Sequence, residues 1–114
     1  MKKTLISLTM LAAMLLPIYA QEAPAAPEKE GRIQRRKENQ QGRIAQGVSS
    51  GQLTAGETAN LEHKEARLNR EVHNDRTSNG GTLTPQERRQ VNRQQNRLSK
   101  NIYRDKHNGT TQQK

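Results

Sequence analysis

Cysteine, tryptophan and phenylalanine are absent from this 114-residue chain. Without cysteine the chain can form neither a disulfide framework nor a thiolate metal site, and it offers no thiol for a lipid anchor. Its two tyrosines are too few to build the stacking platforms on which proteins bind single-stranded nucleic acid. No DNA-binding motif occurs either, so we expect no specific nucleic-acid recognition.

Large apolar side chains are also scarce. After residue 20 the chain has twelve of them, which is too few to stabilise an extensive core. A free-standing fold would therefore be marginally stable, and a homo-oligomer or folding on a partner is the alternative source of stability.

The sequence also lacks the motifs of common enzymes. No glycine-rich phosphate loop, GxSxG turn or HExxH zinc motif occurs, and His63, His73 and His107 do not have the spacing of metal ligands. A core this small could scarcely desolvate a catalytic group. We expect a protein that is not an enzyme and has no cofactor, calcium being the one exception considered below.

The one long apolar run lies at the N-terminus. Residues 1–20 begin with a pair of lysines, continue through an apolar stretch over 5–16, and reach Pro17 shortly before Ala20. This order is typical of a secretory signal peptide cleaved after Ala20. A transmembrane helix is the alternative, but the run is shorter than the ~20 apolar residues that a bilayer requires. We expect a bacterial protein that is periplasmic or secreted, with no transmembrane segment after cleavage.

The remainder of the chain divides into four segments. Residues 21–30, rich in alanine, proline and acid, predict a disordered linker. Residues 31–47 are polar and helix-permissive, with two isoleucines on roughly one face, and predict a short or frayed helix. Residues 48–108 hold a tandem repeat, and residues 109–114 are expected to form a disordered tail.

The repeat is the most informative feature of the sequence. Residues 49–76 align with residues 79–106 at an offset of thirty, with seven identities among 28 positions. Duplication of one loop-plus-helix unit, over 48–78 and 79–108, explains the match best. The pattern predicts helices over about 55–75 and 85–107.

Each unit opens with GxLTxxE, which predicts a helix start. Thr54 and Thr84 stand at N-cap positions, where a hydroxyl group can accept an early backbone N–H. Glu57 and Glu87 follow three positions later and can complete a capping box. In the second unit Pro85 takes the first helical position, where its missing N–H costs nothing.

A narrow apolar stripe at spacing i, i+7, i+11 follows each start and spans only ~40° around the helix. Such a stripe is more typical of a helix–helix contact line than of a globular core, so the sequence predicts an all-α hairpin or three-helix arrangement. It is also the candidate surface for contact with a partner. The stripe residues are Leu61, Leu68, Val72, Val91, Leu98 and Ile102.

The turn over 75–87 resembles the twelve-residue calcium loop of an EF-hand. Gly81, Leu83 and Glu87 fit late positions of that loop, but Arg76 stands at the first ligand position, where the family uses aspartate. The alternative is a plain capped turn, because helix initiation alone explains GxLTxxE. The resemblance implies a weak calcium site, for which the candidate ligands are Asp75, Asn79 and Glu87.

The sequences LTAGE (53–57) and LTPQE (83–87) resemble the LTxxQ motif of the periplasmic chaperones of the Spy and CpxP type, with glutamate in place of glutamine. That resemblance implies binding of unfolded proteins through a cradle of amphipathic helices. The tandem unit also resembles that of small exported bacterial proteins with GxLTxxE repeats. Convergent helix capping is the alternative explanation.

Positive charge is concentrated near the C-terminus. Residues 21–87 carry ten basic and ten acidic side chains, whereas residues 88–114 have a net charge of +7. Spacings of three and four align these cations along one side of a helix, where they can bind an acidic polymer, an anionic lipid surface or an acidic partner. A solvated face that keeps the protein soluble is the alternative. The candidate residues are Arg88, Arg89, Arg93, Arg97, Lys100 and Arg104.

The sequence as a whole predicts an exported, non-enzymatic interaction protein that binds unfolded clients or polyanions in the cell envelope. A weak calcium-binding module is the alternative function.

Overall fold

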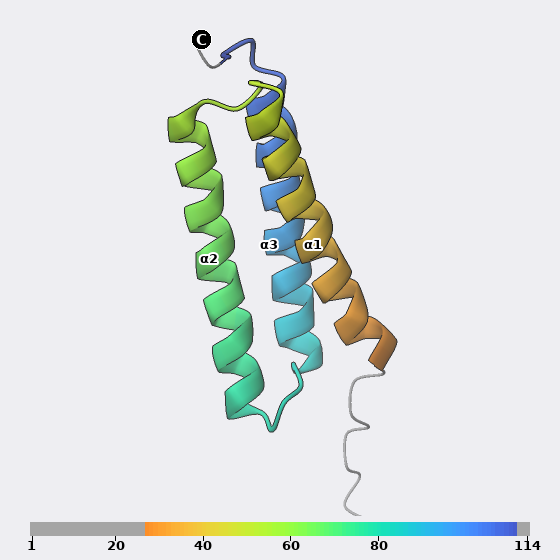
Figure 1. Ribbon diagram of the computed structural model, residues 1–114. Coiled ribbons are helices and arrows are strands. Elements are labelled where there is room, and N and C mark those ends of the chain that lie inside the picture. The colour runs from red at the N-terminus through yellow and green to blue at the C-terminus, as the bar shows by residue number, and fades with distance from the viewer. Residues whose placement is uncertain (1–26, 112–114) are drawn as a thin grey trace, which may run out of the picture.

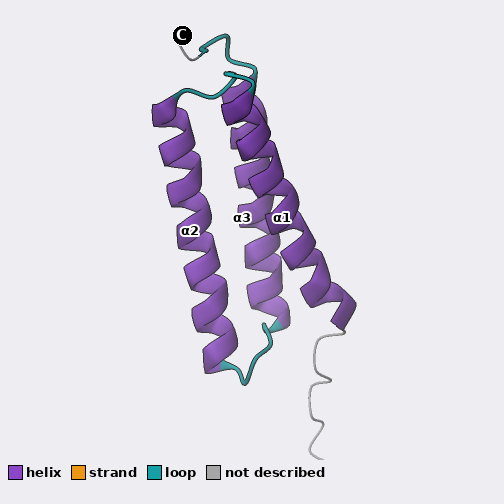
Figure 2. Ribbon diagram, in the orientation of Figure 1, coloured by secondary structure: helices purple, strands orange, loops and turns teal. Residues whose placement is uncertain are grey.

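A computed structural model describes residues 27–111, which form three helices. These are α1 (Pro27–Ser49), α2 (Ala55–Ser78) and α3 (Pro85–Lys106), and α2 runs antiparallel to the other two (Figure 1). No strand occurs within the described range (Figure 2). The predicted all-α, three-helix arrangement is therefore confirmed. The expected signal peptide, linker residues 21–26 and tail residues 112–114 lie outside the described residues.

The first helix is longer than the sequence predicted. It begins at Pro27 rather than residue 31 and continues for 23 residues, so residues 27–30 belong to the helix and not to the linker. Proline is tolerated in a first turn. The carboxylate of Glu30 also ties this turn to the rest of the bundle, because it accepts a hydrogen bond from Arg76 Nε (3.0 Å) and another from Leu83 N–H (3.3 Å). These contacts come from residues 46 and 53 positions away, beyond the reach of local sequence patterns.

The starts of α2 and α3 are as predicted. Thr54 Oγ1 accepts from Glu57 N–H (3.2 Å) while Glu57 Oε2 accepts from Thr54 N–H (2.9 Å). Thr84 and Glu87 repeat this arrangement at 3.2 and 2.8 Å. Both capping boxes are complete, which satisfies backbone donors that a helix start otherwise leaves unpaired.

Ten apolar side chains form the core in two clusters. Each α2 residue of one cluster corresponds, thirty positions later, to an α3 residue of the other cluster. The hairpin of α2 and α3 therefore has an approximate two-fold symmetry. The first helix contributes one isoleucine to each cluster. One cluster contains Ile33, Leu68, Val72, Leu83 and Val91, and the other contains Ile44, Leu53, Leu61, Leu98 and Ile102.

Buried polar side chains occupy the middle of the bundle, between the apolar residues of the two clusters in each helix. Gln40 Nε2 donates to Gln95 O and to Ser99 Oγ, both at 2.8 Å, and Gln95 Nε2 donates to Ile33 O at 3.0 Å. These bonds fix the position of α1 against α3. Glu65, the equivalent of Gln95 in the first unit, is 2% exposed, and neither of its carboxylate oxygens has a hydrogen-bond partner.

Candidate functional site: a basic surface on α1 and α3

Five of the six basic residues predicted as polyanion contacts lie together on the solvent side of α3. At ~100° per residue they fall within an arc of ~80°, opposite the buried residues of the same helix. All five are exposed. We call this set the basic ridge, and its members are Arg89, Arg93, Arg97, Lys100 and Arg104.

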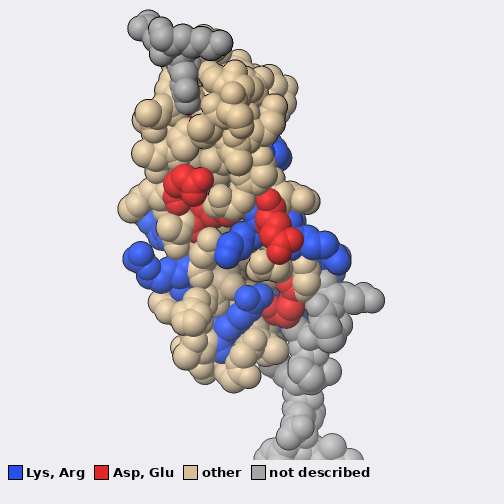
Figure 3. Space-filling view, viewed as in Figure 1, with Lys and Arg blue, Asp and Glu red and all other residues tan. Residues whose placement is uncertain are grey.

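The basic ridge is poorly compensated by acid. Among the side chains that the structure describes there are two ion pairs, Arg76 with Glu30 and Arg104 with Asp105 (3.1 Å). Only one member of the ridge therefore has a carboxylate partner there. Figure 3 shows Lys and Arg side chains interspersed with Asp and Glu side chains over the middle of the visible face, with little charge near the end where α1 terminates.

The equivalent face of α2 shows that a helix of this bundle can form without five cations at these positions. The burial pattern of residues 61–70 is identical to that of residues 91–100, so equivalent positions face solvent in both helices. At the positions of the ridge, however, α2 carries two cations rather than five. Its residues there are Ala59, His63, Arg67, Arg70 and Asn74.

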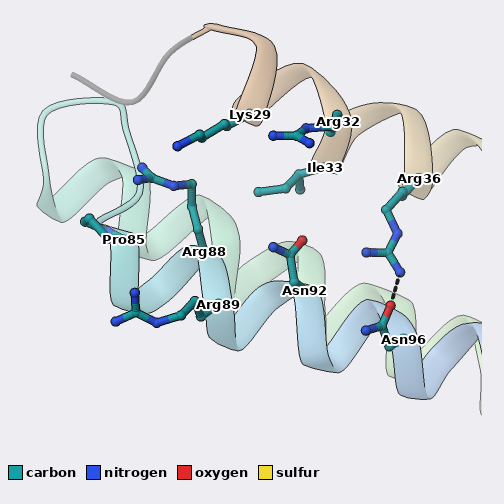
Figure 4. A pocket seen from close by; sticks show the side chains of 9 residues that line it. All are labelled: Lys29, Arg32, Ile33, Arg36, Pro85, Arg88, Arg89, Asn92 and Asn96. Carbon is teal, nitrogen blue, oxygen red and sulfur yellow. Dashed lines mark hydrogen bonds between the residues drawn. The ribbon is translucent and has the colours of Figure 1, made fainter. Parts of the chain in front are cut away.

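The sixth predicted residue, Arg88, does not belong to the ridge. It points toward α1, where it lines a groove of about 550 Å³ between the N-terminal halves of α1 and α3 (Figure 4). Across this groove lie three cations of α1, namely Lys29, Arg32 and Arg36, and Arg89 stands at its edge on α3. We call this the basic groove. Its lining is completed by Ile33, Pro85, Asn92 and Asn96.

The cations of α1 were missed by the sequence analysis. Residues 21–87 are neutral overall, which concealed Lys29, Arg32 and Arg36 within a balanced segment. Their spacing of three and four, which places them on one face of a helix, was the signal that could have found them. That this face lies beside α3 became evident only from the packing.

The apolar stripe predicted as a partner-contact seam lies inside the bundle. All six of its residues belong to the two core clusters, and Leu61, Val91 and Ile102 are completely inaccessible. In this arrangement the stripe holds the helices together. Binding of an unfolded protein along it would require the helices to separate.

Two of the candidate calcium ligands contact each other. Asn79 Nδ2 donates to Glu87 Oε2 (2.7 Å), and the same oxygen accepts from Thr84 N–H. These bonds, that from Thr84 above all, lower the pKa of Glu87. Desolvation, with the nearby carboxylates of Glu87 and Glu71, raises the pKa of Asp75. Among residues 27–111 no three His, Cys, Asp or Glu side chains come together to hold a metal. Calcium binding stays a prediction, which amide shifts during a calcium titration would test.

Fold and surface define the class of molecule within the described residues: a three-helix bundle in which two helices begin with a capping box, with a basic face on α3 and a basic groove between α1 and α3. No protein-family model, no curated protein and no solved structure matches this chain. Within the described residues no helix is long and apolar enough to cross a membrane.

Proposed function

We propose that this chain is an exported, non-enzymatic interaction protein of the bacterial cell envelope that binds polyanions through α3. The observation that carries the proposal is the basic ridge, whose five exposed cations have one carboxylate partner among the described residues. Export is supported by the signal-like residues 1–20. Polyanions are favoured over unfolded clients because the apolar stripe is buried, whereas the ridge is open to solvent.

The ridge suits a long anionic partner. It extends over 15 residue steps, or ~22 Å at ~1.5 Å per residue, so it can contact several charges of an acidic polymer or a lipid surface at once. Each contact releases bound counterions, which makes the affinity depend strongly on salt. Tyr103 is the one Phe, Trp or Tyr among residues 27–111, which is too few for a stacking platform, so recognition rests mainly on charge.

The proposal is tested by measuring binding to heparin and to anionic vesicles over a range of salt concentrations. Arg97→Gln with Lys100→Gln should weaken binding and lower the slope of log affinity against log salt by about two, since each lost contact lowers it by about one. The matched control is Arg67→Gln with Arg70→Gln, which removes the same charge from the equivalent positions of α2. An equal loss in both variants would show that net charge alone attracts the polymer, and the ridge would have no special role.

A further inference from the structure

We propose that the basic groove is a binding site for a compact ligand that carries two or three neighbouring phosphate groups. The inference rests on the proposed polyanion function and names the ligand for one part of that surface. The groove differs from the ridge because it is concave and brings cations from two helices into one space of about 550 Å³ (Figure 4).

The groove is strongly basic. Four guanidinium groups and one ammonium group line it, and no carboxylate is among the lining residues that the structure describes. Two of the guanidinium groups are oriented by neutral acceptors, because Arg36 Nη2 donates to Asn96 Oδ1 and Arg88 Nη1 donates to Leu83 O at 2.7 Å. These bonds hold the side chains in place without cancelling their charge. Like charges gathered in this way repel one another, so a bound anion would stabilise the folded chain.

Phosphate is the anion that this set of donors suits best. Guanidinium groups match the geometry of phosphate with paired N–H donors, and the amide groups of Asn92 and Asn96 can add neutral donors. The N-termini of the parallel helices α1 and α3 lie at the same end of the groove and add partial positive charge there. A phosphate monoester carries about −1.5 to −2 at neutral pH, so two or three of them balance five cations. The volume also falls in the range of small-ligand sites.

The duplicated unit shows that this chemistry is not a by-product of the fold. The α3 residues of the groove correspond, thirty positions earlier, to residues of α2 that carry no positive charge. In place of Pro85, Arg88, Arg89, Asn92 and Asn96, α2 has Ala55, Thr58, Ala59, Glu62 and Ala66. The same helical scaffold is thus stable with small or acidic residues at these positions, so the stability of a helix in this bundle does not account for the cations of the groove.

Three double variants, each of which lacks two positive charges, distinguish binding at the groove from binding at the ridge. Arg32→Gln with Arg36→Gln removes two groove cations from α1 and leaves the ridge whole. Arg97→Gln with Lys100→Gln does the reverse, and Arg67→Gln with Arg70→Gln touches neither site. Circular dichroism confirms that each variant is folded before binding is measured.

The probe is inorganic triphosphate, with citrate at equal ionic strength as the control anion. We expect triphosphate to raise the melting temperature of the wild-type protein and to shift amide signals of residues 29–36 and 85–96, with a weaker response to citrate. The groove variant should lose affinity for triphosphate by about tenfold or more, since hydrogen bonds to charged groups are the strong ones. The ridge and control variants should each lose less than about threefold.

Two vesicle compositions distinguish the sources of phosphate. If triphosphate displaces the protein from vesicles of phosphatidic acid but not from vesicles of phosphatidylserine, the groove holds a lipid headgroup; binding of triphosphate without binding of either vesicle assigns a soluble phosphate compound. Equal losses of triphosphate affinity in all three variants, or amide shifts confined to the ridge, would overturn the inference. If triphosphate fails to bind while heparin binding still depends on the ridge, the groove site is refuted and the polyanion function stands.

Discussion

Glu65 is a buried carboxylate in the middle of the bundle. It is 2% exposed, and both carboxylate oxygens lack a hydrogen-bond partner. Burial raises its pKa above the ordinary value of 4.5. The side-chain amide of Gln41, which comes near without forming a hydrogen bond of normal geometry, and the charge of Lys37 oppose this shift, whereas the charge of Glu62 adds to it. A buried polar group without a partner costs ~1 to 3 kcal/mol. Glu65 lies at the same helical register as the apolar stripe of α2, but the sequence alone does not show that its side chain is enclosed.

The pH dependence of stability follows from this shift. A folded state with the higher pKa binds the proton more tightly, so the contribution of Glu65 is fully present below pH 4.5 and is lost as the pH rises through the folded pKa. Glu65→Gln should therefore stabilise the protein at pH 8, by ~1 to 3 kcal/mol in urea unfolding, and change little at pH 4. The exposed Glu38→Gln is the control, because the charge of Glu38 is not among the causes that shift the pKa of Glu65. A loss of stability at pH 8 in Glu65→Gln would contradict the prediction.

The capping glutamates, Glu57 and Glu87, have the opposite effect on how stability depends on pH. The hydrogen bond from the backbone of Thr54 is the main cause that lowers the pKa of Glu57, and Thr84 does the same for Glu87. Their contribution is present above the ordinary pKa of 4.5 and is lost as the pH falls through the lowered value. Below pH 7 the stability of the wild-type protein should therefore depend on two opposing contributions. That of Glu65 falls as the pH rises, and that of the capping glutamates falls as the pH drops.

The caps themselves are tested with threonine variants. Thr54→Ala and Thr84→Ala should each cost ~1 kcal/mol in chemical unfolding, because each removes a side-chain acceptor from a helix start. Thr→Ser at the same positions keeps the oxygen and should retain most of the stability. Alanine variants as stable as wild type would mean that the glutamates alone define the helix starts.

At the scale of elements, the sequence predicted α2 and α3 closely because their start signals are local. GxLTxxE contains every group of the capping box, so the bond pattern could be derived within four residues. The first helix has no such motif. Its start depends on Glu30 meeting Arg76 and Leu83, which the chain brings together only after the bundle has formed.

Two glycines of α1 give a matched test of its packing. A Cβ at Gly47 would lie 2.7 Å from Leu53 Cδ1, whereas a Cβ at Gly42 would meet nothing within 4 Å. Gly42→Ala should therefore stabilise the protein by up to ~1 kcal/mol through helix propensity. Gly47→Ala gains the same propensity but must displace a buried leucine, so it should be destabilising by ~1 to 3 kcal/mol. Thermal unfolding of both variants measures the contrast, and similar melting temperatures would contradict the close approach of Leu53.

At the scale of the whole molecule, the sequence predicted the basic ridge of the candidate site but not the basic groove. The basic ridge lies on one helix, so charge counting over consecutive residues found it. The basic groove brings together cations of α1 and α3 that are about fifty to sixty positions apart in the sequence. A single sequence does not show that α1 packs against α3. The buried bonds of Gln40 to Gln95 and Ser99 make that contact specific.

The same packing predicts that the hairpin of α2 and α3 does not fold alone. In the absence of α1 each core cluster loses one isoleucine, Ile33 or Ile44, worth ~3 to 6 kcal/mol together when buried. Small domains have only ~5 to 15 kcal/mol of net stability, and this core has ten apolar residues in all. Circular dichroism of a fragment spanning residues 50–111 should therefore show little helix, and a peptide of residues 27–49 added in trans should restore it. If the fragment is fully helical and melts cooperatively without the peptide, the hairpin of α2 and α3 is an independent fold, and α1 serves only to complete the groove.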